Sequence, residues 1–220
     1  MNTNMQKITL YHGSRNGITG NIKPESREKC DFGKGFYMGT NPMQAKTLIY
    51  NETTPMFYTL DFHLENIPED KILTLSDINW AFYILYNRGR LESINTTSFY
   101  KRIAQMDTGK DVIIGPIADD KMGMVMREFA RNTITDKGML ECIRCINYGI
   151  QYVAKTENAC NQIEVKSKEP LNIDEYEEYQ KFTDERREES EQKVNAIREQ
   201  YLREGKFLKE ILEEEQKKEK

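Results

Sequence analysis

Histidine, tryptophan and long apolar runs are scarce in this chain of 220 residues. It contains two histidines, one tryptophan and four cysteines. A structural zinc site usually needs four cysteine or histidine ligands, so the CxxC pair of Cys142 and Cys145 would have to recruit scattered partners. We therefore expect the cysteines to be reduced thiols and the chain to bind no metal.

Membrane-spanning and secretion segments are also missing from the pattern. No run approaches the roughly 18 apolar residues that a membrane span needs, and the first residues, MNTNMQKITLYHGS, lack the apolar core of a secretion signal. These features favour a cytoplasmic protein that does not interact with a membrane. Internal repeats are absent as well.

Most of the chain has no excess of positive or negative charge, and the acidic excess lies at its end. Residues 174–220 contain 16 acidic and 11 basic residues, which leaves 20 acidic and 21 basic residues in the rest. A nearly neutral body has no general electrostatic attraction for nucleic acid, although a local basic patch would still be compatible with it.

What is present is an irregular mixture of short apolar and amphipathic segments, which predicts an α+β fold. Strands are expected at 7–12, 35–40, 56–64, 111–117, 150–156 and 163–167. Helices are expected at 42–50, 77–88 after a cap at Ser76, 97–106, 122–131 and 138–147. We divide the chain into a body, residues 1–170, and a charged helical tail, residues 171–220.

The tail should form one long helix or two in series, because it is rich in Glu, Lys, Arg and Gln. One interpretation is a solvated helix that docks on the body through Tyr176, Tyr179 and Phe182. The alternative is a coiled coil with a partner or a second copy, for which apolar residues at heptad spacing provide a short contact stripe. The docking interpretation is favoured because these apolar residues span barely two and a half heptads. A separable tail also predicts that truncation near Pro170 leaves ligand binding intact.

The segment from Leu10 to Tyr50 contains the strongest functional signal. His12 ends a predicted strand and precedes Gly-Ser, and Gly33 and Gly35 flank Lys34 in a sharp bend just before Tyr37. Such a bend allows a ligand to approach the backbone closely, and a tyrosine beside it can stack on a planar ring. The structural alternative is a capped turn, a hairpin and a core tyrosine.

LYHGSRNGI followed by FGKGFY resembles the NAD-binding signature of the poly- and mono-ADP-ribosyltransferases. The resemblance implies a split, mostly antiparallel sheet with surrounding helices, with NAD as substrate. The His–Tyr–Glu set of that superfamily places its histidine on His12 and its tyrosine on Tyr37. The glycine that holds the nicotinamide carboxamide falls on Gly13.

The resemblance also assigns NAD contacts around these residues. It implies that His12 bonds the adenosine ribose and that Tyr37 stacks on nicotinamide, while Arg15 and Lys34 could reach the pyrophosphate. The full set of implied NAD-binding residues is His12, Gly13, Ser14, Arg15, Lys34, Gly35, Phe36, Tyr37 and Tyr50. A serine of the polymerases is replaced by Ala45, and the place of their second stacking tyrosine is taken by Leu48.

A second resemblance covers most of the body. YHGS, DFGKGFY, GPIADDKM and IQYVAKTENA are together similar to an uncharacterised bacterial domain family that is grouped with these transferases. In that family a glutamine occupies the third position, which is Gln151 here. A glutamine can hydrogen-bond a ribose hydroxyl, but it supplies neither negative charge nor a base. Asp119 and Asp120 are candidates for the missing carboxylate, although they also suit a helix cap.

These features lead to three expectations for function. The first is a mono-ADP-ribosyltransferase that modifies a protein, a nucleic acid or a small molecule, in the manner of a bacterial or phage effector or toxin. The second is a module that binds or hydrolyses NAD without transfer. The third is an interaction protein that acts through its tail. In the first two, we expect His12, Tyr37 and Gln151 to converge on one cleft.

Overall fold

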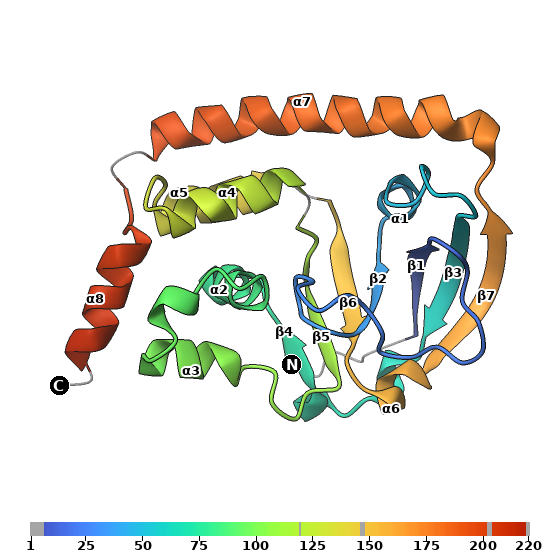
Figure 1. Cartoon of the computed structure of the whole chain (residues 1–220), viewed down its shortest axis with the longest axis horizontal. Coiled ribbons are helices and arrows are strands. Elements are labelled where there is room, and N and C mark those ends of the chain that lie inside the picture. The colour runs from blue at the N-terminus through green and yellow to red at the C-terminus, as the bar shows by residue number, and fades with distance from the viewer. Residues whose placement is uncertain (1–6, 119, 146–147, 202–203, 219–220) are drawn as a thin grey trace.

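The fold is α+β, with one mixed sheet and a helical layer beside it. The computed structural model describes residues 7–118, 120–145, 148–201 and 204–218. Within these ranges the sheet has the order β4-β5-β6-β2-β1-β3-β7 (Figure 1). Its strands are β1 (Ile8–Ser14), β2 (Phe36–Gly39), β3 (Met56–Phe62), β4 (Ile72–Thr74), β5 (Val112–Pro116), β6 (Ile150–Ala154) and β7 (Ile163–Pro170).

The sheet consists of two halves with continuous ladders. In one half, β3 pairs antiparallel with β1 over seven residues and with β7 on its other side. In the other half, β6 pairs antiparallel with both β2 and β5, and β4 adds a parallel edge to β5. The mostly antiparallel sheet that we expected is confirmed.

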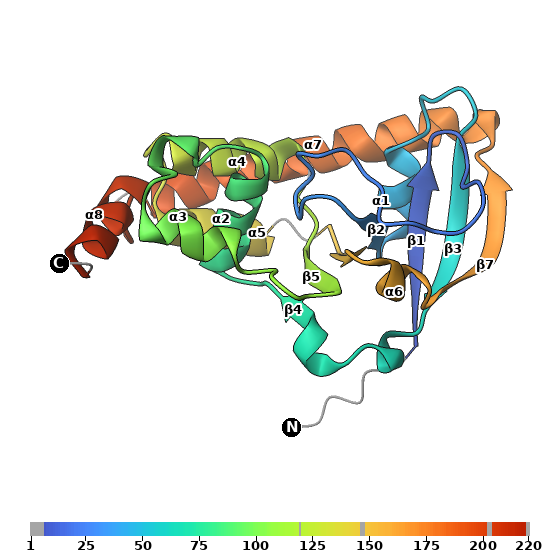
Figure 2. The same ribbon diagram turned by 60° about the horizontal axis from the view of Figure 1, so that its bottom comes forward.

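The helices lie mainly at the β4–β5 end of the sheet, with α1 above the β1 half and α7 crossing over both (Figures 1 and 2). The α-helices are α1 (Pro42–Thr47), α2 (Ile78–Asn87), α3 (Ser98–Ala104), α4 (Asp120–Ala130), α5 (Asp136–Cys145), α6 (Glu157–Cys160), α7 (Tyr176–Gln200) and α8 (Leu208–Lys218). Short 3-10 turns lie at Leu64–Asn66, Glu69–Lys71, Glu92–Ile94 and Ile173–Glu175.

Two apolar cores lie on opposite faces of the sheet, because successive strand residues point to opposite sides. The larger core, which we call core A, joins Ile113 and Val153 of the sheet to helices α2 to α5 and contains Trp80. Core B contains Leu10, Phe36 and other residues of the opposite face. The tryptophan is fully buried, and its indole N–H donates to the carbonyl of Pro116 at 3.0 Å.

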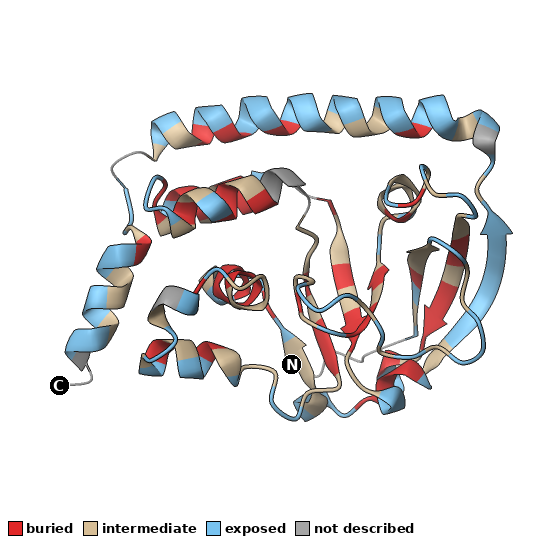
Figure 3. Ribbon diagram, viewed as in Figure 1, coloured by how far each residue is buried: buried red, intermediate tan, exposed pale blue. Residues whose placement is uncertain are grey.

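The tail forms two helices in series, and its first helix docks on the body. Val194 and Ile197 of α7 are buried in core A, and Leu208 joins them from α8. The face of α7 turned toward the body alternates between buried and partly buried residues, while its outer face is exposed (Figure 3). The apolar residues at heptad spacing that would have served a coiled coil therefore pack within the chain.

Three local predictions need correction. Strand β4 was not expected, because a three-residue edge strand leaves too little pattern to recognise. Helix α2 is capped by Asp77, whose carboxylate accepts from the amide of Asn79, and not by Ser76. Helix α1 ends at Thr47, three residues earlier than predicted.

Candidate functional site

The two halves of the sheet meet at one residue pair. Among the described residues, Tyr11 pairs with Gly39 and joins β1 to β2. Beyond this pair β1 continues through His12, Gly13 and Ser14, which pair only with β3. The YHGS and FGKGFY motifs therefore face each other where the two half-sheets separate, and we call this junction the seam.

His12 connects the two strands at the seam through its side chain. Its Nδ1 lies 2.7 Å from the carbonyl oxygen of Tyr37. Because a carbonyl oxygen can only accept, Nδ1 carries the proton and Nε2 of a neutral ring is an acceptor. Burial lowers the pKa of His12 below its ordinary value, which favours this neutral form. The ring lies 4.5 Å from that of Phe36, centroid to centroid.

Tyr37 is tied to the turn that precedes its own strand. Its hydroxyl donates to the carbonyl of Gly33 at 2.6 Å and accepts from the amide of Phe32 at 2.9 Å. Burial raises the pKa of this phenol far above its ordinary value, so the side chain acts as a neutral ring and not as a base. The hydroxyl thus fixes the ring beneath the Phe-Gly-Lys-Gly turn.

Gln151 lies on the same face of the sheet as Tyr37. It pairs with Gly39 on β2, and Tyr37 pairs with Val153, so both side chains point to the side of core A. The residue is 7% exposed, and its Nε2 donates to the carbonyl of Pro116 at 3.0 Å. One N–H of this amide is therefore used within the protein.

The expectation that His12, Tyr37 and Gln151 converge on one cleft is wrong. The His12 ring packs beside Phe36, which points to core B, whereas Tyr37 and Gln151 point to core A. The physical reason is the two-residue alternation of a strand, which places adjacent positions on opposite faces. Tyr37 and Gln151 share one face of the sheet, and His12 reaches that side only through the Tyr37 backbone.

An ion pair that we did not predict lies beside Tyr37 and Gln151. Asp31 contacts Arg88 through a single oxygen, Oδ1, at 2.6 Å from Nη2 and 2.8 Å from Nε. Its carboxylate also lies near the Gln151 side chain, which slightly offsets the rise in the pKa of Asp31 that burial causes and so favours the ionised form. Arg88 is 57 positions away in sequence, so no local pattern announces the pair. The available signal was the acidic residue that directly precedes FGKGFY.

Two glycines of the motifs are required because neighbouring elements approach them too closely for a Cβ. A Cβ on Gly13 would lie 2.3 Å from the carbonyl oxygen of Ala45, in helix α1. A Cβ on Gly35 would lie 2.5 Å from the side chain of Val153. Both contacts bring secondary elements together, so these glycines serve the packing around the seam whether or not a ligand also approaches them.

The other residues of the predicted NAD-binding set are spread around this centre. Arg15 forms an exposed ion pair with Glu52 at 3.0 Å, and Lys34 is exposed in the turn. Ser14 is half-buried at the end of β1. Tyr50 is directed elsewhere, since its ring lies 4.9 Å from that of Tyr176 at the start of α7. The start of the tail helix therefore packs beside Tyr50.

The remaining carboxylate candidates follow strand β5. Asp119 and the side chain of Asp120 lie outside the described residues, and helix α4 begins at Asp120. Within the described part of the chain, no group of three or more His, Cys, Asp or Glu side chains is arranged to hold a metal ion. Cys142 is buried in α5, which raises the pKa of its thiol to about 12.

Comparison with known proteins identifies the family. Residues 8–165 match the family described as "Protein of unknown function (DUF3990)". The match begins at β1 and ends within β7. The chain belongs to this family. No curated protein and no solved structure gives a match. No helix among the described residues is both long and apolar enough to cross a membrane.

Proposed function

We propose that this protein binds NAD at the seam and transfers its ADP-ribose unit to an acceptor, with release of nicotinamide. One observation carries the proposal. The two motifs that resemble the ADP-ribosyltransferase signature face each other where the half-sheets separate, and the His12 side chain hydrogen-bonds the Tyr37 backbone across that junction.

The residue chemistry suits the two ends of NAD. His12 points to the opposite face of the sheet from Tyr37, so its neutral Nε2 can accept a hydrogen bond from a ribose hydroxyl only where NAD passes through the opening between β1 and β2. The immobilised Tyr37 ring offers a flat surface on which nicotinamide can stack. Cleavage of the nicotinamide–ribose bond passes through an oxocarbenium-like transition state, so the site must also stabilise developing positive charge.

The acceptor in this proposal is a protein, a nucleic acid or a small molecule, and the cytoplasm is the expected compartment. The family resemblance supports a role as a bacterial or phage effector or toxin. The exposed outer face of α7 remains available for a partner, although its inner face is occupied by the body.

A second candidate is a module that binds NAD without transfer, or that only hydrolyses it. The observation in its favour is Gln151, which stands where the resemblance expects the third functional residue and carries no negative charge. Nicotinamide release separates the two candidates, because a pure binding module produces none.

Replacement of Tyr37 tests the proposed site most directly. Tyr37→Ala removes the stacking ring, whose contribution beyond area burial is about 0.5–1.5 kcal/mol, so NAD binding should weaken severalfold or more. Calorimetric titration with NAD, and with nicotinamide as competitor, measures the effect. Tyr86→Ala is a matched control, because Tyr86 is a partly buried tyrosine that contacts Tyr100 on the helical side.

The outcomes distinguish the candidates. Equal NAD affinity in wild type and Tyr37→Ala would remove Tyr37 from the binding site. Incubation with NAD labelled in the adenosine moiety and with cell lysate, followed by protease or nuclease digestion, locates the acceptor. Label that stays with peptides or nucleotides supports transfer, and label found only in free ADP-ribose supports hydrolysis.

A further inference from the structure

We propose that Asp31 supplies the carboxylate that Gln151 lacks and acts as the catalytic acidic residue of the NAD site. The inference rests on the proposed function. Its basis is the juxtaposition of Asp31, Gln151 and Tyr37, which lie in the turn before β2, on β6 and on β2, respectively.

The first argument is contact. A Cβ on Gly115 would lie 2.8 Å from the ring of Phe32, the residue after Asp31, and Gly115 pairs with Gln151, the residue at the third position of the resemblance. The Asp31 carboxylate therefore lies near the Gln151 amide. Arg88 approaches only Oδ1 of the carboxylate, through Nε and Nη2. The two guanidinium contacts therefore converge on one oxygen and do not form a bidentate fork across both.

The second argument is the rigidity of the turn that holds Asp31. The amide of the next residue, Phe32, donates to the Tyr37 hydroxyl, and its carbonyl accepts from the ammonium of Lys155. Gly33 has a φ of +71° and a Cβ there would lie 2.9 Å from Oδ1 of Asn87. Preorganised charge of this kind is what stabilises a transition state most effectively.

The third argument is charge. The Asp31 side chain is 15% exposed and that of Arg88 is 27% exposed, so neither charge is freely solvated. Burial raises the pKa of Asp31, while Arg88 acts in the opposite direction and favours the ionised form. A carboxylate of low exposure beside a single cation is costly for stability and suited to a site where positive charge develops.

The reaction balances without any further reagent. The bond between C1′ of the ribose and the nicotinamide nitrogen breaks, and nicotinamide leaves as a neutral molecule with the bonding electron pair. The Asp31 carboxylate stabilises the positive charge that develops on the ribose. Water or an acceptor hydroxyl then forms the new bond to C1′, and its proton passes to a base or to solvent.

The central experiment compares Asp31→Asn with wild type. The substitution keeps the shape of the side chain and removes its charge. We expect nicotinamide release to fall by about 10²–10³-fold, the scale observed on removal of one preorganised electrostatic contact, while NAD affinity changes less than about threefold. Asp61→Asn is the matched control, because Asp61 is a buried, ion-paired carboxylate in the other half-sheet.

A second variant separates catalysis from folding. Arg88→Lys keeps a cation beside Asp31 but weakens its hold, so the acid limb of the pH–rate profile should move to higher pH. A purely structural ion pair predicts lower thermal stability with an unmoved acid limb. This profile also decides the matter if Asp31→Asn does not fold.

Failure of the inference and failure of the proposed function are distinguishable. If wild type binds no NAD, the proposed function fails and Asp31 loses its role with it. If wild type binds NAD but releases no nicotinamide, in water or with lysate, the catalytic role is overturned and the binding module stands. If folded Asp31→Asn releases nicotinamide at nearly the wild-type rate, Asp31 is overturned while the transferase stands.

Discussion

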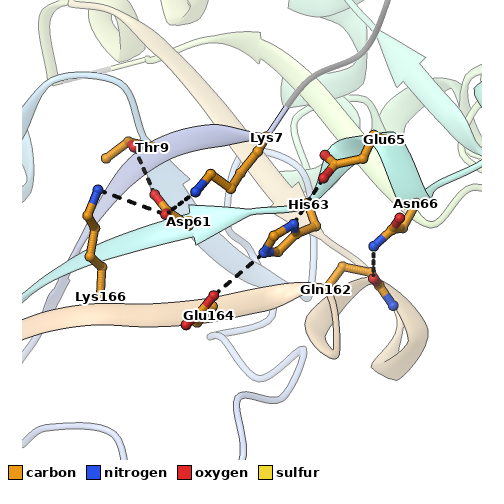
Figure 4. Close-up of polar contacts among 9 residues, drawn as sticks. All are labelled: Lys7, Thr9, Asp61, His63, Glu65, Asn66, Gln162, Glu164 and Lys166. Carbon is orange, nitrogen blue, oxygen red and sulfur yellow. Dashed lines mark hydrogen bonds and ion pairs between the residues drawn. The ribbon is translucent and has the colours of Figure 1, made fainter.

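Asp61 and Asp31 are two carboxylates of low exposure among the described residues, one beside each half of the sheet, and they have opposite surroundings. Asp61 of β3 accepts from Lys7 and Thr9, and Lys166 lies 3.9 Å away (Figure 4). The hydrogen bond from Lys7 is the main reason that its pKa falls below the ordinary value. Asp31 beside β2 has Arg88 as its cation, yet burial raises its pKa.

The difference shows which half of the molecule tolerates unfavourable burial. A carboxylate with a lowered pKa stabilises the fold above its unfolded pKa, whereas one with a raised pKa opposes folding in the charged form. Asp61 therefore supports the β1–β3–β7 half at neutral pH. Asp31 is retained at a cost, and such costs concentrate at functional sites.

The largest effect should come from breaking the Asp31 pair. Arg88→Ala leaves a buried carboxylate without its cation, which typically costs about 3–5 kcal/mol of unfolding free energy. Lys7→Ala should cost far less, because Lys7 is 50% exposed and solvent screens its pair with Asp61. Urea denaturation of both variants measures the contrast. Equal losses would show that the two carboxylates are held alike.

A smaller effect should come from the tail helix that braces core A. Ile197→Val removes one buried methylene from this core, and a change of this kind costs about 0.5–1.5 kcal/mol. The exposed Val165 on edge strand β7 provides a control, since Val165→Ala removes little buried surface. Thermal unfolding compares the two. An unaltered melting temperature for Ile197→Val would mean that the tail does not stabilise the body.

The smallest effect should be a pH dependence in the β3–β7 half. His63 lies between Glu65, 3.0 Å from Nδ1, and Glu164, 3.6 Å from Nε2 (Figure 4). Hydrogen bonding to Glu65 is the main cause that raises its pKa above 6.5. The raised pKa stabilises the fold below about pH 6.5, and this contribution disappears as the pH rises through the folded-state pKa.

The comparison of wild type with His63→Gln checks this sign. The difference in unfolding temperature should be largest near pH 5.5 and should vanish by about pH 8.5, because His63 is then neutral in both states. A difference that grows with pH would contradict the assignment. The effect is modest because the partners are well exposed.

The sequence predicted those elements whose signals are local. Asn41 before Pro42 indicated helix α1, and the Asn41 side chain does accept from the amides of Met43 and Gln44. The CxxC segment lies in α5, as its apolar pattern indicated. Gly89 follows α2 with a φ of +66°, as expected for a residue that ends a helix.

The parts that the sequence did not predict depend on contacts between distant residues. Asp31 meets Arg88 and Gln151 only after the turn, α2 and β6 have assembled. The face of His12 depends on the register at the seam, and a shift of one residue reverses every side chain. The position of Val194 and Ile197 depends on the docking of α7, which its charged sequence does not reveal.

Helix α7 also sets the distance between the two parts of the body that it contacts. Near its start Tyr179 lies against Tyr50, which follows α1, and five turns later Ile197 enters the core beside α5. Arg186, between them, donates to Gln44 of α1 at 2.8 Å. Because each inserted residue rotates all later positions by about 100°, single insertions within this span would turn Ile197 away from the core. A whole inserted turn would restore the direction of Ile197 but would displace it by about 5.4 Å along the helix axis, so the span between the two contacts should tolerate neither kind of insertion.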